Sequence, residues 1–211
     1  QKYNTTISAI SKEIFLLYKE DNRQIGGCPM TITEFFASLH GISLRYWGEI
    51  GLAVHVVCVH QGRQIRKSGE PYLEHVFGVM AQMIAMKLPK VTVIAACLHD
   101  IVEDTDATVE MIRDNFGEKV ARIVWGVSKG PHEDFDSEQE RLDEFYERFM
   151  RCIQEDWEAV FPKLGDRLHN LLTLEGLRNS DPELFQRMPM ETIKFYVPLA
   201  FKYAPPLVPP Q

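Results

Sequence analysis

The chain has 211 residues, of which 45% are hydrophobic and 25% are charged, so it is long enough and apolar enough to bury a full core and is not a disordered chain. Its net charge of −7 at pH 7 argues against a general nucleic-acid-binding protein, which would present a broad basic face. A phosphate-rich ligand would need a local basic cluster or a metal ion.

Apolar residues recur at three- and four-residue steps along nearly the whole chain and two-residue alternation is scarce, so we predict an all-α protein. The expected helices, in chain order, cover residues 7–18, 31–40, 45–60, 72–86, 91–101, 108–117, 118–129, 137–158 and 161–174, with a last helix before residue 204. Capping boxes at Thr31 and Ser137 favour helix starts there, and Gly117 suits a helix end.

The same pattern divides the chain into three parts. We expect residues 1–40 to form an N-terminal helical extension and residues 41–205 to form one domain. Residues 206–211 continue a proline-rich tail that cannot extend a helix.

The cysteines and the lack of long apolar runs indicate the cellular compartment in which the protein is expected. Cys28, Cys58, Cys97 and Cys152 show no zinc-finger spacing, so we expect reduced thiols in a cytoplasmic protein. No apolar run reaches the roughly 18 residues of a membrane span, and the first residues form no export signal. Since residue 1 is Gln rather than Met, we expect a trimmed start.

The stretch LHDIVEDT at 98–105 changes character abruptly. It follows the apolar run VTVIAAC, yet it carries His99, Asp100, Glu103 and Asp104. Three neighbouring carboxylates repel one another and need either a compensating cation or full solvation, which fits poorly with an apolar approach. A His-Asp pair alone is more often a surface patch or a helix end.

Two further segments carry matching side chains. In KLGDRLHNLLTL, Asp166, Asn170 and Thr173 form a polar row at i, i+4 and i+7, opposite leucines that mark an apolar face. Taken alone, this helix favours the alternative of a solvated face with Arg167 at the surface. His75 follows a tight Gly-Glu-Pro turn, and a single His there is usually structural.

Two imidazoles and two carboxylates from three expected helices together make a metal-ligand set: His75, His99, Asp100 and Asp166. This mixture suits Mn2+, Fe2+ or Zn2+, and the lack of a thiolate argues against a structural zinc site; we favour Mn2+. Such an ion lowers the pKa of bound water and screens charge on a phosphoryl group. Glu103 and Asp104 would then orient the water and accept its proton.

A basic loop precedes His75. Arg63, Arg66 and Lys67 place three cations within five residues, which alone indicates only a solvated loop. Beside a metal site, the loop predicts a clamp for phosphate or a nucleobase, because Arg donates two parallel hydrogen bonds to phosphate and also stacks on flat rings.

Five blocks stand out in the sequence: RKSGEPYLEHV (66–76), CLHDIVEDTDAT (97–108), FGEKVARIVWGVSK (116–129), KLGDRLHNLLTL (163–174) and ETIKFYVPLA (191–200). In this order they resemble the hydrolase domain of RelA/SpoT homologues, the HD-superfamily enzymes that degrade the alarmone (p)ppGpp. The resemblance spans residues 45–205.

The resemblance implies an all-helical HD fold, that of a metal-dependent phosphohydrolase, in residues 41–205, with one Mn2+ held by the four ligand residues. In this family, a guanosine-3′,5′-bis(diphosphate) 3′-pyrophosphohydrolase removes the 3′-diphosphate as pyrophosphate and leaves GDP or GTP. The expected partner is thus a small nucleotide, and neither nucleic acid nor a membrane is expected. We expect no room for a synthetase domain in this chain. The sequence does not determine the oligomeric state, and a homo-oligomer is possible.

Roles carry over to single residues by the same resemblance. Glu103 and Asp104 would form the catalytic pair. The nucleotide contacts that the resemblance implies are Arg66 at the base, Lys67 beside it, and Asn170 and Thr173 at the ribose and phosphate region. The chain departs from the family at Val76, where Pro is usual, and at Gly165, where Ala is common; a helix-interior Gly costs about 1 kcal/mol.

Two alternatives remain open. The same fold could act on another nucleotide, such as (p)ppApp or NADPH, because the motifs that grip diphosphate and metal do not read the base. A non-catalytic HD module that binds alarmone and signals to a partner would be expected to lack a ligand or the acidic pair, and both are present here.

Overall fold

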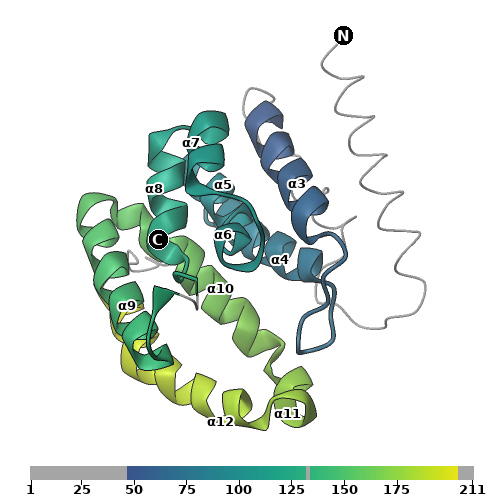
Figure 1. The fold of residues 1–211 in the computed structure, drawn as a ribbon, viewed down its shortest axis with the longest axis vertical. Helices are drawn as coiled ribbons and strands as arrows, with labels where there is room; N and C mark the ends of the chain where they lie inside the picture. Colours follow the sequence, from purple (N-terminus) through teal and green to yellow (C-terminus); the bar gives the residue numbers. More distant parts are fainter. Residues whose placement is uncertain (1–46, 132–133, 204–211) are drawn as a thin grey trace, which may run out of the picture.

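A computed structural model describes residues 47–131 and 134–203 of the chain (Figure 1). The helices expected over 7–18 and 31–40, which would make up the N-terminal extension, lie outside the described residues. The tail at 206–211 and the capping box at Thr31 also lie outside them.

The described part of the chain is all-α, as predicted, and its one β-bridge pairs Ile65 with Pro71. Its helices are α3 (Trp47–Gln61), α4 (Tyr72–Ala85), α5 (Lys90–Cys97), α6 (Ile101–Asp104), α7 (Val109–Phe116), α8 (Glu118–Val127), α9 (Glu138–Glu155), η4 (Trp157–Ala159), α10 (Val160–Leu172), η5 (Leu174–Gly176), α11 (Leu177–Ser180), α12 (Pro182–Glu191), the π-helix η6 (Thr192–Tyr196) and α13 (Val197–Tyr203). None of these helices is long and apolar enough to cross a membrane.

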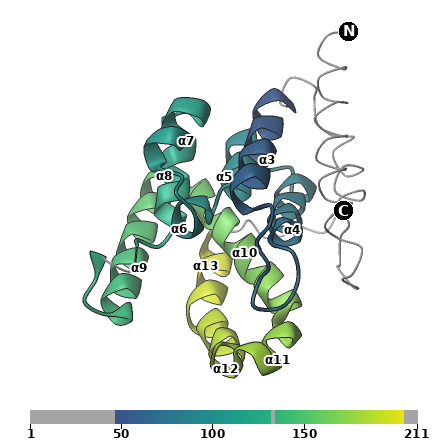
Figure 2. The same cartoon turned by 45° about the vertical axis from the view of Figure 1, so that its right-hand side comes forward.

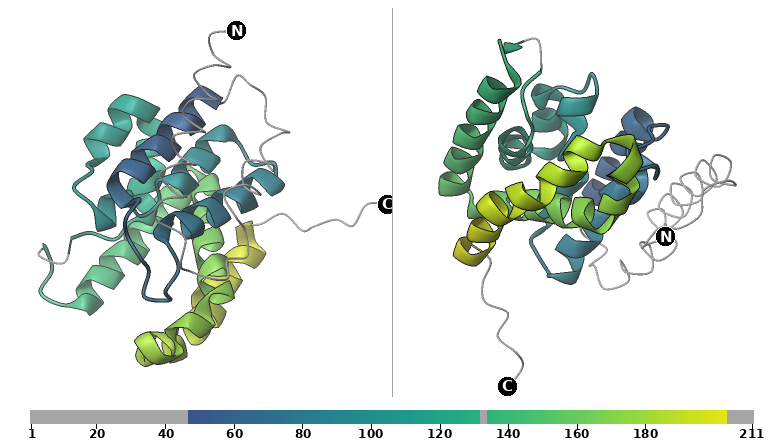
Figure 3. Two further views of the ribbon diagram at one scale, coloured as in Figure 1. Left: turned by 90° about the vertical axis from the view of Figure 1, so that its right-hand side faces the viewer. Right: turned by 90° about the horizontal axis from the view of Figure 1, so that it is seen from below.

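Helices α4, α5 and α10 pack on one another in the middle of the molecule. Helix α5 is enclosed along most of its length, since its residues from Thr92 to Cys97 are all buried. Helix α3 covers α5 from one side and α8 covers it from another, while α12, η6 and α13 run back along α10 (Figure 2). Seen from below, this C-terminal segment extends toward α9 (Figure 3), where Tyr146 donates a 2.7 Å hydrogen bond to Glu191.

Local signals set several helix ends where the sequence predicted them. The Ser137 hydroxyl accepts a 3.1 Å hydrogen bond from the Glu140 N–H, which caps α9. Gly117, with φ of 87°, ends α7 in a conformation that favours glycine. Helix α9 ends at Glu155 rather than Glu158, because a 3-10 turn intervenes before α10.

The single helix expected over 91–101 is wrong, because residues 98–100 form a turn between α5 and α6. The His99 ring bonds through Nδ1 to the Ala96 carbonyl at 2.8 Å, and Ser128 donates to the His99 carbonyl at 2.9 Å. In a continuous helix, Ala96 would accept from the Asp100 N–H instead. The break frees His99 and Asp100 from helical geometry, so both side chains turn toward α10.

Helix α10 buries its polar face rather than its apolar one. Lys163, Asp166 and His169 are buried, while Leu168 and Leu172 are 48% and 64% exposed. The solvated polar face that the helix favoured when taken alone is therefore wrong. The buried polar groups find their partners on α4 and the turn at 98–100, which periodicity within one helix does not reveal.

Gly165 allows α10 to approach α4 closely. A Cβ atom at this position would lie 2.8 Å from Cε of Met83 and 3.1 Å from Cγ1 of Val79. The absence of a side chain therefore serves the packing of these two helices, which offsets the lower helix propensity of glycine.

Candidate metal centre and nucleotide pocket

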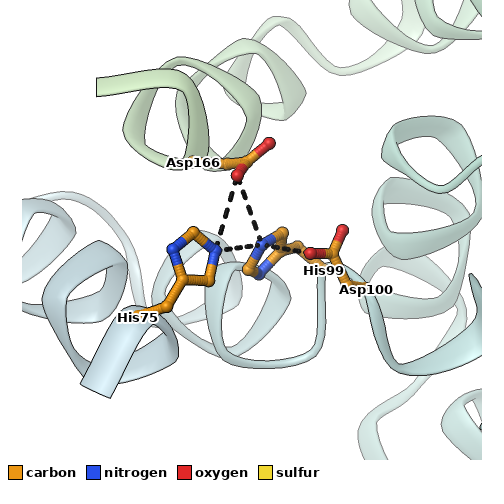
Figure 4. Close-up of side chains that lie close together, drawn as sticks. All are labelled: His75, His99, Asp100 and Asp166. Carbon is orange, nitrogen blue, oxygen red and sulfur yellow. Dashed lines mark hydrogen bonds and ion pairs between the residues drawn. The ribbon is translucent and has the colours of Figure 1, made fainter. Parts of the chain in front are cut away.

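Four side chains from α4, the turn at 98–100 and α10 meet at the centre of the molecule (Figure 4): His75, His99, Asp100 and Asp166. Each offers one ligand atom, and these atoms all lie within 4.8 Å of one another. Nε2 of His75 lies 3.2 Å from Nε2 of His99 and 3.4 Å from Oδ1 of Asp166. Nε2 of His99 lies 3.0 Å from Oδ2 of Asp100.

These distances fit a shared metal ion. Two donors that each bind an ion at about 2.1 Å lie about 3.0 to 3.4 Å apart at octahedral or tetrahedral angles. Two imidazole nitrogens and two carboxylate oxygens are a donor set that suits Mn2+, Fe2+ or Zn2+. The four side chains can therefore hold one divalent ion.

Charge and burial shift the pKa values of the candidate metal ligands. Burial, followed by the positive charge of Arg66, holds the pKa of His75 well below its usual value, so this imidazole is neutral. Burial acts to raise the pKa of Asp166, but the Lys163 ammonium, together with His99 and His75, outweighs it and lowers the pKa to about 2. Burial also opposes protonation of His99, yet the Asp100 carboxylate raises its pKa overall. A metal ion would displace that proton.

Hydrogen bonds fix the orientation of both imidazoles. Nδ1 of His99 donates to the Ala96 carbonyl, which leaves Nε2 with a free lone pair. Nδ1 of His75 lies 3.1 Å from Nδ1 of His169, so a proton on the first nitrogen is donated to the second. Gly78 makes room for this neighbour, since a Cβ there would lie 2.6 Å from Nε2 of His169.

The two aspartates are also held. Tyr72 donates a 2.6 Å hydrogen bond to Oδ2 of Asp100. Asn170 donates a 2.5 Å hydrogen bond to Oδ1 of Asp166, and Nζ of Lys163 lies 3.4 Å from Oδ2. Asn170, which we expected at the substrate, thus also orients a candidate metal ligand.

Glu103 and Asp104 have different surroundings. Glu103 accepts from the Lys129 N–H at 3.2 Å, and its other oxygen lies 3.2 Å from the Arg141 guanidinium. Asp104 is exposed to the pocket, and partial desolvation followed by the negative charge of Asp100 and Glu103 raises its pKa to about 6. A carboxylate with this pKa can accept a proton near neutral pH.

A pocket of about 880 Å³ opens beside the four side chains, a volume that suits a nucleotide. The predicted residues on its wall are Arg66, Lys67, Glu103, Asp104, Asp166, Asn170 and Thr173. Arg63 is exposed and does not line this pocket, so the structure does not bring it to the site.

Arg66 ties the basic loop to α10. Its guanidinium donates to Glu70, to the Asn170 side-chain oxygen and, at 3.3 Å, to the Thr173 hydroxyl. Lys67 reaches the other way and donates a 2.8 Å hydrogen bond to Asp181 at the start of α12.

The sequence did not predict that several other residues line the pocket: Tyr72, Lys129, Lys163, Arg167, Arg187 and Tyr196. Arg167 is only 12% exposed, lies 3.2 Å from a Glu191 oxygen and stacks over the Tyr196 ring at 4.2 Å. Lys163 carries a signal that could have been used, since it lies one helical turn before Asp166. The others reach the pocket through tertiary contacts alone.

Comparison with known proteins places the site in context. Residues 53–203 match the family described as HD domain. The Haemophilus influenzae guanosine-3′,5′-bis(diphosphate) 3′-pyrophosphohydrolase is 40% identical, and the Escherichia coli bifunctional (p)ppGpp synthase/hydrolase SpoT is 39% identical, each over 143 residues. Each alignment covers 68% of this chain and 20% of the relative, so the chain spans about a fifth of the length of these proteins.

A solved structure described as a metazoan ortholog of SpoT that hydrolyzes ppGpp has a similar fold. The TM-score is 0.50 at 22% identity, and the match covers 69% of this chain and 94% of that one. At this identity the likeness concerns the fold alone.

Proposed function

This chain belongs to the HD domain family, and from that premise we propose that it is a metal-dependent 3′-pyrophosphohydrolase of ppGpp and pppGpp. The relatives named for this activity support the proposal, and they align with the part of the chain that holds the site. The products would be pyrophosphate and GDP or GTP.

The observation that carries the proposal is that the four-residue cluster reaches the wall of a nucleotide-sized pocket through Asp166. His75, His99 and Asp100 meet Asp166, and Arg66 and Asn170 line the pocket beside it. A phosphoryl group beside the cluster would lie within reach of cationic and amide donors, which suits an anionic substrate.

We propose Mn2+ as the ion, because the donor set combines nitrogen and oxygen and lacks the thiolates of structural zinc sites. A bound divalent ion activates water as a nucleophile and offsets charge on the phosphoryl group. Tyr72, Asn170 and Lys163 would keep the two aspartates in place for it.

The chain's own residues would then do the following work. Asp104 accepts the proton from the attacking water, since its carboxylate is exposed to the pocket. Glu103 would orient this water as the second member of the pair, held in place by Lys129 and Arg141. Arg66 and Lys67 would bind the nucleotide, with Arg66 stacking on the base. Asn170 and Thr173, which both line the pocket, would contact the ribose and phosphate region.

We also propose that the substrate is a free nucleotide rather than nucleic acid, and that the protein works in the cytoplasm. The free thiols of Cys58, Cys97 and Cys152 support this location, since an oxidising compartment favours disulfides.

The test is a turnover assay of the purified protein on ppGpp, pppGpp, ppApp and NADPH, each with and without added Mn2+, with products identified by chromatography. We expect pyrophosphate and GDP or GTP only when Mn2+ is present. Rapid cleavage of ppApp or NADPH without cleavage of ppGpp would assign the fold to another nucleotide. Binding of ppGpp without cleavage would identify a non-catalytic module.

A further inference from the structure

One basic side chain on the pocket wall differs from the others. The pocket is lined by six basic residues: Arg66, Lys67, Lys129, Lys163, Arg167 and Arg187. The first five each lie within 4.0 Å of a carboxylate, with these pairs: Arg66 with Glu70, Lys67 with Asp181, Lys129 with Glu103, Lys163 with Asp166 and Arg167 with Glu191. Within residues 47–131 and 134–203, no carboxylate forms an ion pair with Arg187.

Arg187 lies on the part of the pocket wall that α12 forms. It is an exposed residue of α12, and it shares the neighbourhood of the Lys67–Asp181 ion pair, whose N–O distance is 2.8 Å. The pKa of Asp181 lies below its usual value because Lys67 and the Leu184 N–H donate hydrogen bonds to it and the charge of Arg187 also acts on it. Lys67 and Arg187 therefore line the same pocket, one from the basic loop and one from α12.

Two consecutive hydrogen bonds connect the basic loop to the candidate metal ligand Asp166. Asp166 accepts from Asn170, and Asn170 in turn accepts from Arg66, so Arg66 is two contacts away from the ligand. Lys67 follows Arg66 in the chain but points away to Asp181. Arg66 thus serves the groups beside the cluster, whereas Arg187 lines the same pocket from α12.

Resting on the proposed function, we infer that Arg187, together with Lys67, binds the diphosphate that is not cleaved, on the 5′ side of the nucleotide. A substrate whose 3′-diphosphate lies at the cluster must place its second diphosphate elsewhere in the same pocket. An arginine can bind phosphate through two parallel hydrogen bonds, and Arg187 breaks no ion pair to do so.

The experiment compares two substrates that differ only at the 5′ side: ppGpp and guanosine 3′-diphosphate, which has no 5′-phosphate. Turnover is measured for the unmodified protein, Arg187→Ala and Arg187→Lys. Arg178→Ala is the matched control, because Arg178 is an exposed arginine that pairs with Glu175 and does not line the pocket. Circular dichroism checks that each variant is folded.

We expect Arg187→Ala to raise the KM for ppGpp about tenfold more than the KM for guanosine 3′-diphosphate, the scale of one lost charged hydrogen-bond pair. Arg187→Lys should recover part of this difference, and Arg178→Ala should show none. An equal change for the two substrates, or no change for either, would overturn the assignment.

A binding experiment distinguishes failure of this inference from failure of the proposed function. The dissociation constants of both nucleotides are measured by calorimetry with the same proteins in the absence of turnover. If the unmodified protein binds ppGpp but does not cleave it, the hydrolase proposal fails, and the binding difference still decides the role of Arg187. If it binds neither nucleotide, both proposals fail.

Discussion

Nδ1 of His75 lies 3.1 Å from Nδ1 of His169, and the two rings meet edge to face at an interplanar angle of 84°. His75 can offer Nε2 to a metal ion only if Nδ1 carries its proton, so His169 is the acceptor that selects this tautomer. A histidine in this position is unusual, because carboxylates, carbonyls and water are the common partners.

Replacing His169 should therefore weaken metal binding. We expect His169→Phe to raise the Mn2+ dissociation constant by roughly 10 to 100-fold, the usual effect of removing a group that orients a ligand. Isothermal titration with Mn2+ measures it. Leu168→Ala, at an exposed neighbour on α10, is the control. A dissociation constant within about twofold of the unmodified protein would show that His169 only fills space.

Gly78 should be intolerant of a side chain. A Cβ there would come within 2.6 Å of Nε2 of His169, so Gly78→Ala should lower the free energy of unfolding by about 1 to 3 kcal/mol. Gly51 on α3 has nothing within 4 Å of an added Cβ, so Gly51→Ala should leave stability unchanged or raise it by about 0.5 to 1 kcal/mol. Urea denaturation measures both, and equal effects would contradict this packing.

Lys163 should matter most when no metal is bound. Its side chain is 6% exposed and neutralises Asp166, so Lys163→Met leaves a buried carboxylate without its cation. We expect a loss of about 3 to 5 kcal/mol in the presence of a chelator and a smaller loss with saturating Mn2+, which supplies positive charge instead. Lys119→Met, at a pair whose lysine side chain is 42% exposed, should cost under about 1 kcal/mol in both conditions. Equal losses for Lys163→Met with and without Mn2+ would contradict the assignment.

Asp104 gives the metal-free protein a distinct pH dependence. Its pKa is raised to about 6 in the folded protein, against about 3.9 in an unfolded chain, so its ionised form destabilises the fold. This penalty is complete above about pH 6 and fades as the pH falls toward about 4. In chelator, Asp104→Asn should therefore be more stable than the unmodified protein at pH 8, with the advantage disappearing near about pH 4. Asp114→Asn, at an exposed carboxylate, is the control, and an equal effect of pH on both variants would contradict this prediction.

The same substitution separates catalysis from binding. Asp104→Asn should lower kcat for ppGpp by at least about 100-fold, because an amide cannot accept the proton from water, while nucleotide binding stays measurable. Steady-state kinetics and calorimetry report the two effects. Full activity in this variant would mean that another group accepts the proton.

Much of the site could be predicted because its residues carry local signals. The acidic run after the apolar segment pointed to His99 and Asp100, and the i, i+4 row on α10 pointed to Asp166 and Asn170. The all-α class followed from periodicity.

The rest depended on contacts between distant segments. At the turn at 98–100, Ser128, directly after α8, donates a hydrogen bond to the His99 carbonyl, which a continuous helix would use for its own backbone. The role of His169 could not be predicted from the sequence, because it depends on the contact with His75, which lies on α4. Arg187 reaches the pocket because α12 folds back along α10, and no spacing along the chain encodes that return.

Crystals grown with Mn2+ would test the central claim most directly, through an anomalous difference map that locates the ion. The account predicts one strong peak bonded to side-chain atoms of His75, His99, Asp100 and Asp166, and loss of that peak in His99→Ala. A peak elsewhere, or no peak with the four side chains turned apart, would contradict it.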